Sequence, residues 1–484
     1  MLKSKKTKIV ATLGPAINSC ENPKEMLKNL MVSGVNVFRI NFSHADYDEV
    51  TRMVNTIREL NDELGFHVAC LADLQGPKLR VGVMQEGVEL AVGDVFTFTT
   101  ADLPVGTQEK AFMTYENFPI DVKVGEQILV DDGKLLFEVT ATDGKENVTT
   151  KVLRGGPLKS KKGVNLPNTA ISLPALTEKD VKDAIFALSL KVDWMALSFV
   201  RNPADLDDIH KLIEENSDTS EYRTRVVSKI EKPEAIENID AIIANTDALM
   251  VARGDLGVEI PMAEVPLVQK MLVKKAKEAK KPVIIATQMM ETMIENQVPT
   301  RAEVNDVANS IMDGADAVML SGETSVGAYP IEVIRKMRDI ITSCEHSPLI
   351  QVPRIAPVLN DPERFISNGI CYQAALLADN IDAKAISTVT YSGYTAVQIS
   401  ALRPHSHILA YSPNKRVLAM LNLYYGVKAK YYSSDASTID TINEVNEIAM
   451  KYGFLEKGDH VINLNATPVE EQGMTNTIRV SQIK

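Results

Sequence analysis

Apolar, β-branched runs recur at regular intervals along the chain, and most of them end in small or polar residues. Segments with the apolar spacing of a helix, such as 23–34, 49–65 and 265–281, lie between most of these runs. Strands that alternate with helices in this way predict a (β/α)8 TIM barrel, which is a parallel barrel surrounded by helices. The expected barrel strands are residues 7–14, 35–44, 67–76, 192–201, 225–232, 248–257, 282–290 and 317–324.

Two other parts of the chain follow a different pattern. From Val81 to residue 166, short alternating runs are broken by Gly and Asp, which is typical of antiparallel strands joined by hairpin turns. After Ser343, strands and helices alternate again, as in a separate α/β domain. We therefore expect a barrel of residues 1–76 and 168–344, an inserted small β-barrel of residues 77–167, and a C-terminal α/β domain of residues 345–484. The strands expected in the last part are 383–390, 407–413, 427–433 and 460–466.

Composition and charge exclude several classes of protein. The chain has 484 residues and a formal net charge of −12, which argues against nucleic-acid binding. No apolar run reaches the roughly 18 residues that are needed to cross a bilayer. The four cysteines are far apart and form no CxxC pair, so we expect reduced thiols and no zinc or disulfide framework. These features predict a cytoplasmic protein that binds neither nucleic acid nor membrane.

Polar residues occupy the C-terminal ends of six expected strands, which is where barrel enzymes build their active sites. Side chains in a strand alternate between two faces, so the residues of each strand end share one face. A solvated strand end or a structural ion pair would explain any one of them, but the whole set favours an active site. The residues are Arg39, Asn41 and Ser43; Asp73; Lys229 and Glu231; Arg253 and Asp255; Thr287; and Ser321 and Glu323.

The residue types at these ends indicate the chemistry of the site. Glu231 and Asp255 supply two carboxylates without a His or Cys cluster, and oxygen ligands of this kind suit Mg²⁺ or Mn²⁺ better than zinc. Lys229 and Arg39 add positive charge that suits a small phosphorylated substrate. Neither GxxxxGK[ST] nor GxGxxG occurs, so a nucleotide would have to bind in another way.

Several long motifs also resemble one family. They include VFRINFSHA (37–45), SKIEK (228–232), MVARGDLGVEIP (250–261) and PTRAEVNDVANSIMDGADAVMLSGET (299–324). Shorter ones are TKIVATLGP (7–15), VDDGK (130–134), SKKGVNLP (160–167) and IIATQM (284–289). Over essentially its whole length the chain resembles pyruvate kinase. The resemblance implies a barrel with an inserted β-barrel lid domain and a C-terminal regulatory and oligomerisation domain. It also implies the Mg²⁺-dependent transfer of a phosphoryl group from phosphoenolpyruvate to ADP, which gives pyruvate and ATP in glycolysis.

The resemblance also implies roles for individual residues. Arg39 and Lys229 should hold the transferring phosphoryl group, and Glu231 and Asp255 should bind Mg²⁺ (or Mn²⁺). Gly254, Asp255 and Thr287 match substrate-binding positions, and Thr287 and Ser321 are candidates for delivering a proton through water. The nucleotide-binding positions are Asn41, Phe42, Ser43, His44, Arg80 and Lys162. Closure of the lid would bring Lys162 onto the phosphates. One departure from the family pattern is Lys232, where many relatives have Asn.

A monovalent-cation site is also implied by the resemblance. Asn41, Ser43, Asp73 and the carbonyl of Leu74 match ligands of a cation that is usually K⁺. Potassium-dependent relatives carry Glu at the position of Lys78. We expect the Gly76-Pro77 turn to bring the Lys78 ammonium near Asp73, where it would replace K⁺ and make K⁺ unnecessary. Alternatively, Lys78 points to solvent between the barrel and the lid.

The C-terminal part contains a candidate effector loop. Residues 390–400 combine a strand, a turn and a helix start, and such a turn can offer backbone N–H groups to a phosphate. The matching residues are Thr390, Ser392, Gly393 and Thr395, although an ordinary strand–helix turn would look the same. The loop 465–476 lacks the Trp and Arg of relatives that respond to fructose-1,6-bisphosphate, and it adds Glu470 and Glu471. We therefore expect AMP or a sugar monophosphate as effector, and a homotetramer from the resemblance alone.

Two other functions fit part of this pattern. An enolate-forming carboxy-lyase or aldolase of the Mg²⁺ barrel class would use Lys229 and the two carboxylates, but it would need neither Lys162 nor a lid. A catalytically inactive binding protein is disfavoured because all of the charged positions above are intact.

Overall fold

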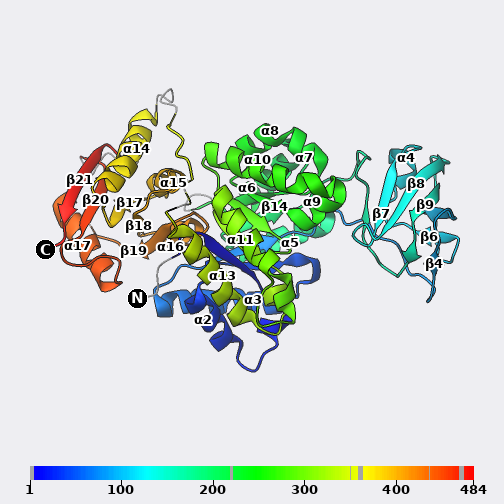
Figure 1. The fold of residues 1–484 in the computed structure, drawn as a ribbon, viewed down its shortest axis with the longest axis horizontal. Coiled ribbons are helices and arrows are strands. Elements are labelled where there is room, and N and C mark those ends of the chain that lie inside the picture. Colours follow the sequence, from blue (N-terminus) through cyan, green and yellow to red (C-terminus); the bar gives the residue numbers. More distant parts are fainter. Residues whose placement is uncertain are drawn as a thin grey trace.

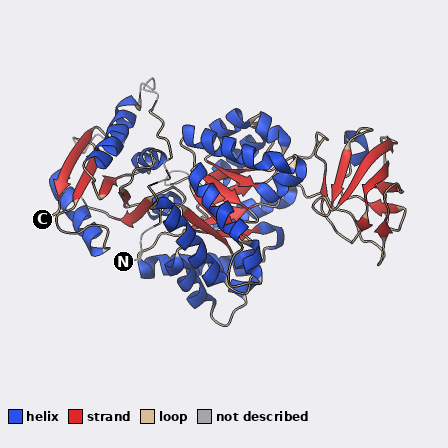
Figure 2. Ribbon diagram, viewed as in Figure 1, coloured by secondary structure: helices blue, strands red, loops and turns tan. Residues whose placement is uncertain are grey.

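The computed structural model describes residues 5–217, 222–348, 350, 352–357, 363–434, 437–467 and 474–484, except for the side chains of His44 and Thr438. The molecule is elongated, with the barrel in the middle and the two other parts at opposite ends of the long axis (Figure 1). Strands fill the centre of the barrel and helices surround it, while the part at the far right of the view is almost entirely β-structure (Figure 2).

The eight predicted barrel strands all form, and they close a parallel barrel in which chain order is also spatial order. Each of them is shorter than the segment predicted for it. The strands are β1 (Lys8–Thr12), β2 (Val37–Asn41), β3 (Ala69–Asp73), β12 (Trp194–Leu197), β13 (Arg225–Ile230), β14 (Ala248–Ala252), β15 (Val283–Ala286) and β16 (Ala317–Leu320). The main helices around them are α2 (Pro23–Ser33), α3 (Tyr47–Leu64), α5 (Glu178–Ser189), α6 (Ala204–Asn216), α8 (Ile239–Asn245), α10 (Val265–Glu278), α11 (Arg301–Asp313) and α13 (Pro330–Glu345).

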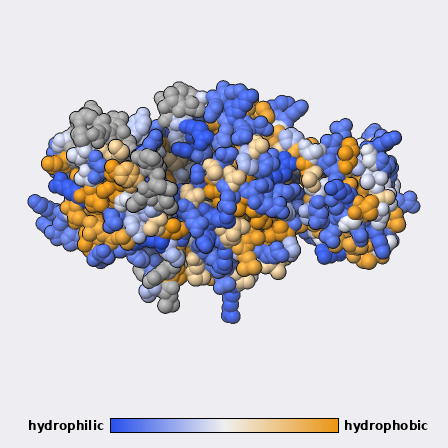
Figure 3. All heavy atoms as spheres, turned by 90° about the horizontal axis from the view of Figure 1, so that it is seen from above, coloured by the Kyte–Doolittle hydropathy of each residue, from blue (hydrophilic) through white to orange (hydrophobic). Residues whose placement is uncertain are grey.

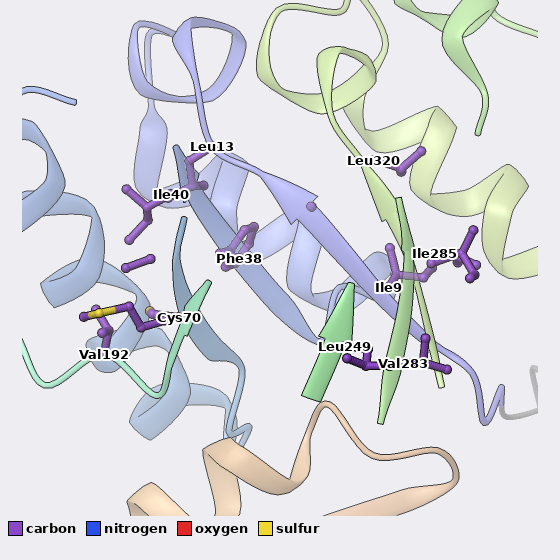
Figure 4. Packing of buried hydrophobic residues seen from close by; sticks show 14 of the residues in the cluster. Ile9, Leu13, Phe38, Ile40, Cys70, Val192, Leu249, Val283, Ile285 and Leu320 are labelled. Atoms are coloured by element: carbon purple, nitrogen blue, oxygen red, sulfur yellow. The ribbon is translucent and has the colours of Figure 1, made fainter. Parts of the chain in front are cut away.

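Strand alternation divides the barrel core into an outer and an inner layer. Residues such as Ile9, Phe38 and Leu249 pack outward against the helices, and Figure 4 shows this cluster from close by. The residues next to them, such as Val10 and Val37, point into the barrel and are completely buried. Both faces of each strand are therefore apolar, which is why the strands read as continuous hydrophobic runs in the sequence.

Local sequence signals set the helix ends. Thr177 and Asp180 form a capping box at the start of α5, and Thr300 and Glu303 form another at the start of α11. Helix α3 ends at Gly65, which adopts a left-handed conformation with φ of 63°.

The inserted part lies between β3 and β12 and has its own core, which includes the packed rings of Phe96, Phe98 and Phe137. Its largely antiparallel sheet has six strands in the order β11-β7-β8-β9-β5-β6. Arg80 bridges to Gly163 and Val81 bridges to Met113, so this segment joins the two edges of the curled sheet. The strands are β5 (Val95–Thr99), β6 (Lys110–Phe112), β7 (Gln127–Val130), β8 (Leu135–Thr142), β9 (Asn147–Arg154) and β11 (Val164–Asn165), with the pair β4 (Glu89–Leu90) and β10 (Gly156–Pro157) beside them.

The C-terminal part is a five-stranded sheet in the order β19-β18-β17-β20-β21. The four strands predicted here are parallel, and β21 is an additional antiparallel edge strand. The strands are β17 (Ala385–Val389), β18 (His407–Ser412), β19 (Val427–Tyr431), β20 (His460–Asn465) and β21 (Thr477–Gln482). The helices are α14 (Phe365–Asn380), α15 (Tyr394–Ala401), α16 (Lys415–Leu421) and α17 (Thr438–Lys451).

The C-terminal part packs against the N-terminal ends of the barrel strands. Lys8, the first residue of β1, donates to the carbonyl of Val427 at 2.7 Å, and the ring of Trp194 at the start of β12 packs on Tyr424. The opposite end of the barrel, from which the inserted part emerges after β3, is therefore open for a site. Seen from above, the surface mixes hydrophilic and hydrophobic side chains (Figure 3). Among the described residues, no helix is long and apolar enough to cross a membrane.

Candidate active site

A polar layer closes the inner core of the barrel at the C-terminal ends of its strands. The inward alternation that gives Val37, Leu71 and Val227 inside the barrel reaches Arg39 in β2, Asp73 in β3 and Lys229 in β13. Thr12, the last residue of β1, and Ser198, the residue that follows β12, occupy the corresponding positions. The fold therefore brings residues that are far apart in the sequence to one end of the barrel.

Asp73 lies at the centre of this layer and is 1% exposed. Arg39 Nε lies 2.6 Å from Asp73 Oδ2, and Lys229 Nζ lies 3.3 Å from Asp73 Oδ1. Burial alone would raise the pKa of Asp73, but the charges of Lys229 and Arg39 outweigh burial and hold this pKa below its usual range. Asp73 is therefore an ionised carboxylate that holds two cations from different strands.

Lys229 connects Asp73 to Glu231. Its Nζ lies 2.9 Å from Glu231 Oε1 and donates to Ser198 Oγ at 2.7 Å. Burial opposes its charged form, yet the carboxylates of Asp73 and Glu231 raise the pKa of Lys229 above its ordinary value. Lys229 is therefore charged in this site.

Glu231 is 1% exposed, and its second oxygen accepts from the backbone N–H of Phe199 at 2.8 Å. Burial raises the pKa of Glu231, and the negative charge of Asp255 adds to this rise although Lys229 acts against it. Lys229, which also pairs with Asp73, is therefore not enough to offset burial and the charge of Asp255 at Glu231. Oxygen donors in this condition fit a hard divalent cation. Within the described residues, no three His, Cys, Asp or Glu side chains form a group that could hold a metal ion, so such a cation would complete its shell with water or substrate oxygens.

The prediction that Arg253 and Asp255 share a strand face is wrong. Strand β14 ends at Ala252, and both residues lie in the short helix α9 (Arg253–Glu259). Asp255 lines the cleft toward the inserted part, whereas Arg253 turns away and forms a double ion pair with Asp306 at 2.6 and 2.7 Å. A strand that passes directly into a helix changes the side-chain period from two to 3.6, so the extrapolated alternation fails.

Thr287 follows β15 in a left-handed backbone conformation with φ of 69°, and Gln288 has φ of 54°. The Thr287 hydroxyl accepts from the Gly254 N–H at 2.7 Å, and its carbonyl accepts from Arg253 Nη2 at 2.8 Å. Arg253, which the sequence analysis included in the strand-end set without a role of its own, therefore supports the strained backbone that positions Thr287.

The prediction that Ser321 and Glu323 share a strand face is also wrong. Strand β16 ends at Leu320, Ser321 precedes the helical turn α12 (Gly322–Ser325), and Glu323 folds back under it. Glu323 is 2% exposed and accepts from the backbone N–H groups of Ser321 at 2.7 Å and Met290 at 3.1 Å. Burial raises the pKa of Glu323. Its contacts give it a structural role, while Ser321 lines a cavity.

The predicted nucleotide-binding residues border two cavities rather than one. Arg80, Lys162 and Asp255 line a cleft of about 460 Å³ between the barrel and the inserted part. Arg39, Asn41 and Ser321 line a second cavity of about 630 Å³ over β1, β2 and β16. Phe42 and Ser43 lie in the 3₁₀ turn η1 (Phe42–His44) after β2, so Ser43 is not in the strand as predicted; Phe42 is buried, and the side chain of His44 lies outside the described residues.

Lys162 lines the cleft and forms its ion pair within the inserted part. Its Nζ lies 2.8 Å from Asp131 Oδ1, which is also within the inserted part. The hydrogen bond from Lys162 contributes most to a lowered pKa of Asp131. Arg80 donates to the carbonyl of Lys161 at 2.9 Å. Both cations are thus held by their own part of the chain.

The expected partner of Lys78 differs from the observed one. Its ammonium lies 3.5 Å from the hydroxyl of Ser43, while the ion pairs of Asp73 are with Arg39 and Lys229. Burial of the ammonium, and then the positive charge of Lys229, lowers the pKa of Lys78. The Leu74 carbonyl accepts from Ser198 Oγ at 2.7 Å. Lys78 thus lies beside one of the predicted monovalent-cation ligands.

In the C-terminal part, Gly393 precedes α15 with φ of 86°, and its N–H donates to the Thr390 hydroxyl at 3.0 Å. The hydroxyl of Thr395 is hydrogen-bonded to that of Thr475 at 2.7 Å. Ser392 lies in the turn between them. Glu470 and Glu471 lie outside the described residues.

Comparison with known proteins gives consistent matches along the chain. The family model for the pyruvate kinase barrel domain matches residues 4–334, and the model for the pyruvate kinase alpha/beta domain matches residues 368–481. A pyruvate kinase from Mycobacterium intracellulare is 42% identical over 99% of both chains. One from Corynebacterium glutamicum is 42% identical over 98% of this chain and 97% of the relative. The crystal structure of a pyruvate kinase from Cryptosporidium parvum superposes with a TM-score of 0.90 at 32% identity, over 99% of this chain and 96% of that chain.

Proposed function

The chain belongs to the pyruvate kinase family, and we propose that the polar layer at the barrel mouth carries out the reaction of this family. That reaction transfers the phosphoryl group of phosphoenolpyruvate to ADP and gives pyruvate and ATP. The observation that supports the assignment best is the convergence of Arg39 and Lys229, from β2 and β13, on the single carboxylate of Asp73. The family match sets aside the carboxy-lyase or aldolase alternative, and the coupled assay described below tests the inactive one.

Arg39 and Lys229 bind the phosphoryl group in this proposal. A planar guanidinium and an ammonium on opposite sides of a phosphoryl group neutralise its charge and fix its orientation. Phosphoryl transfer asks the protein mainly for positioning and charge stabilisation, and both groups are held by contacts that exist before substrate arrives.

Glu231 and Asp255 would hold the Mg²⁺ (or Mn²⁺) on which the family generally depends. When bound, the ion neutralises charge on the phosphoryl group and on the substrate oxygens. The Gly254 N–H and the Thr287 hydroxyl, which bind each other here, would turn to the substrate carboxylate. Thr287 and Ser321 are the proposed sources of the proton, delivered through water.

The nucleotide is proposed to bind across the cleft that Arg80 and Lys162 line, with residues 41–44 on the barrel side. Residues 77–167 act as a lid in this proposal. Closure would move Lys162 from Asp131 to the phosphates and exclude water, since water would otherwise compete for the phosphoryl group.

Lys78 is proposed to take the place of a monovalent cation. Its ammonium already lies beside Ser43, and the charge requirement of Asp73 is met by Arg39 and Lys229. A K⁺ ion would add a further positive charge close to these cations, which like-charge repulsion disfavours.

Regulation and assembly are proposed from the family resemblance. Residues 390–395, with Thr390, Ser392, Gly393 and Thr395, would bind a phosphate of AMP or of a sugar monophosphate. Strong activation by micromolar fructose-1,6-bisphosphate would contradict this choice. A homotetramer is proposed, and sedimentation tests it.

A coupled assay with lactate dehydrogenase tests the function directly. Phosphoenolpyruvate and ADP should give pyruvate at a rate that depends on Mg²⁺. Failure of the folded protein to form pyruvate from these substrates would contradict the proposed function.

A further inference from the structure

A buried ion pair lines the cleft between the barrel and the inserted part. Lys232 Nζ lies 2.8 Å from Glu259 Oε1, and the two side chains are only 5% and 1% exposed. Charged side chains are rarely buried to this extent, because removing them from water costs much of what the pairing gains. A buried pair of this kind therefore does not add stability in an obvious way, and another role has to be considered.

The ion pair joins the two segments that carry the proposed metal ligands. Lys232 directly follows Glu231 at the end of β13. Glu259 is the last residue of α9, the helix that carries Asp255 in its first turn. The distance between the segments of Glu231 and Asp255 is thus fixed by a contact that involves neither carboxylate.

The same carboxylate also binds the inserted part. Asn165 Nδ2 donates to Glu259 Oε1 at 2.8 Å. Asn165 lies in β11, only three positions after Lys162, and β11 is paired with β7 of the inserted sheet. One oxygen atom therefore receives a donor from the barrel and a donor from the inserted part.

The second carboxylate oxygen of Glu259 can still accept a hydrogen bond. Its Oε2 is buried, and among the described residues it has no hydrogen-bond partner. A buried carboxylate oxygen without a donor is unfavourable, so a rearrangement that supplies one is favoured. The cleft around it is lined by Lys78, Arg80 and Lys161, which are donors.

We propose that Lys232, Glu259 and Asn165 form a positioning unit that sets the position of the inserted part, and with it of Lys162, relative to the two proposed metal carboxylates. This inference rests on the proposed function and deepens it. The three residues are positioning residues: Lys232 fixes the Glu259 carboxylate, and Glu259 anchors β11 through Asn165.

The proposed positioning unit predicts a change in the KM for ADP that is not shared by the KM for phosphoenolpyruvate. If Asn165 is lost, β11 loses its hydrogen bond to the barrel, and the position from which Lys162 would reach the nucleotide is no longer fixed. Arg39 and Lys229 keep all of their contacts. Asn165→Ala should therefore raise the KM for ADP about ten-fold or more, which is the effect expected for losing a hydrogen bond to a charged group. The KM for phosphoenolpyruvate should change by less than about two-fold, since its binding groups are untouched.

The lysine provides a second and independent test. Lys232→Met should raise the KM for ADP in the same way, and Lys232→Arg, which retains charge and donors, should restore it. The double variant Asn165→Ala/Lys232→Met should be no worse than the worse single variant, because both act through Glu259. Lys275→Met, which breaks an exposed ion pair with Asp240 on the barrel surface, is the matched control and should change neither KM.

A direct readout of the anchor is hydrogen exchange of residues 158–167, which should become faster in Asn165→Ala and in Lys232→Met. Thermal unfolding identifies variants that fail to fold, and Asn165→Ala leaves the ion pair intact. The inference is overturned if folded Asn165→Ala and Lys232→Met keep the wild-type KM for ADP, or if the KM for phosphoenolpyruvate rises equally. The proposed function would still stand in both cases, because it is tested separately by pyruvate formation in the wild-type enzyme.

Discussion

Replacing Lys229 by Met should have two separate effects, one on the rate and one on the pH dependence of stability. Lys229 Nζ contacts Ser198 at 2.7 Å, Glu231 at 2.9 Å and Asp73 at 3.3 Å. Methionine has a similar length but no charge. Loss of a group that stabilises charge in the transition state commonly costs about 10²–10³-fold in rate, so phosphoryl transfer should fall by at least this factor.

The stability effect follows from the carboxylates that remain. Among the described residues, Glu231 without Lys229 retains only the Phe199 N–H, and Asp73 retains only Arg39. An uncompensated buried charge costs about 3–5 kcal/mol at neutral pH, but protonation of the carboxyl relieves the cost. In the wild type the pKa of Asp73 lies below its usual range, so its contribution to stability is present above its unfolded-state pKa and is lost as the pH falls through the folded-state pKa.

The pKa of Glu231 already lies above its ordinary value in the wild type, and loss of Lys229, which acts against burial, should raise it further. A carboxyl group with a folded-state pKa above its unfolded value binds a proton in the native state, so stability decreases as the pH rises through this range. The difference in Tm between wild type and variant should therefore widen from pH 5 to pH 8. Thermal unfolding at both values, together with the coupled assay, measures the two effects.

Lys275→Met is the control for both measurements, because its partner Asp240 is 78% exposed and such pairs contribute little. Lys275→Met should keep full activity, and the difference between its Tm and that of the wild type should be the same at pH 5 and pH 8. Near-normal turnover of Lys229→Met would refute the catalytic assignment, and a difference in Tm that does not change with pH would refute the electrostatic one.

Three further predictions concern the metal, the lid and the monovalent cation. Glu231→Gln should raise the Mg²⁺ concentration that gives half-maximal rate, and a metal titration equal to that of wild type would contradict the ligand assignment. Asp131→Asn removes the partner of Lys162, and because this pair is partly exposed, its loss should lower the KM for ADP only about two- to five-fold; an increased KM would show that the pair does not hold Lys162 away from the nucleotide. The wild-type rate should remain near maximal when K⁺ is replaced by a bulky ammonium salt at equal ionic strength, and Lys78→Glu should create K⁺ dependence. A large loss of wild-type rate without K⁺ would defeat this prediction.

The barrel strands could be predicted from the sequence because burial on both faces leaves continuous apolar runs. The C-terminal ends of the strands were harder to predict. The motif ARGDLG reads as the continuation of β14, yet the chain turns into α9 at Arg253, and a similar change occurs after β16 at Ser321. Strand β21 was missed because its residues are mostly half-exposed or exposed and show no apolar run.

The inward position of Arg39, Asp73 and Lys229 followed from parity alone, because these residues lie within regular strands. The tertiary partners of charged side chains could not be predicted from the sequence. The sequence contains no signal that Lys162 pairs with Asp131, or that Glu259 pairs with Lys232. The first contact lies within the inserted part and the second within the barrel, and each joins segments that are far apart in the sequence. Neither propensity nor periodicity reports which distant segments meet.

The arrangement around Asp73 explains how two cations can be placed close together before any anion binds. Arg39 and Lys229 would repel each other in an empty site, and long side chains would turn toward water. Asp73 is fixed between them because β3 pairs directly with both β2 and β12, so its carboxylate has little freedom to move. Its two oxygens hold one cation each, at 2.6 and 3.3 Å. An arriving phosphoryl group therefore meets cations whose positions are already set, and little reorganisation remains to be done when its charge develops.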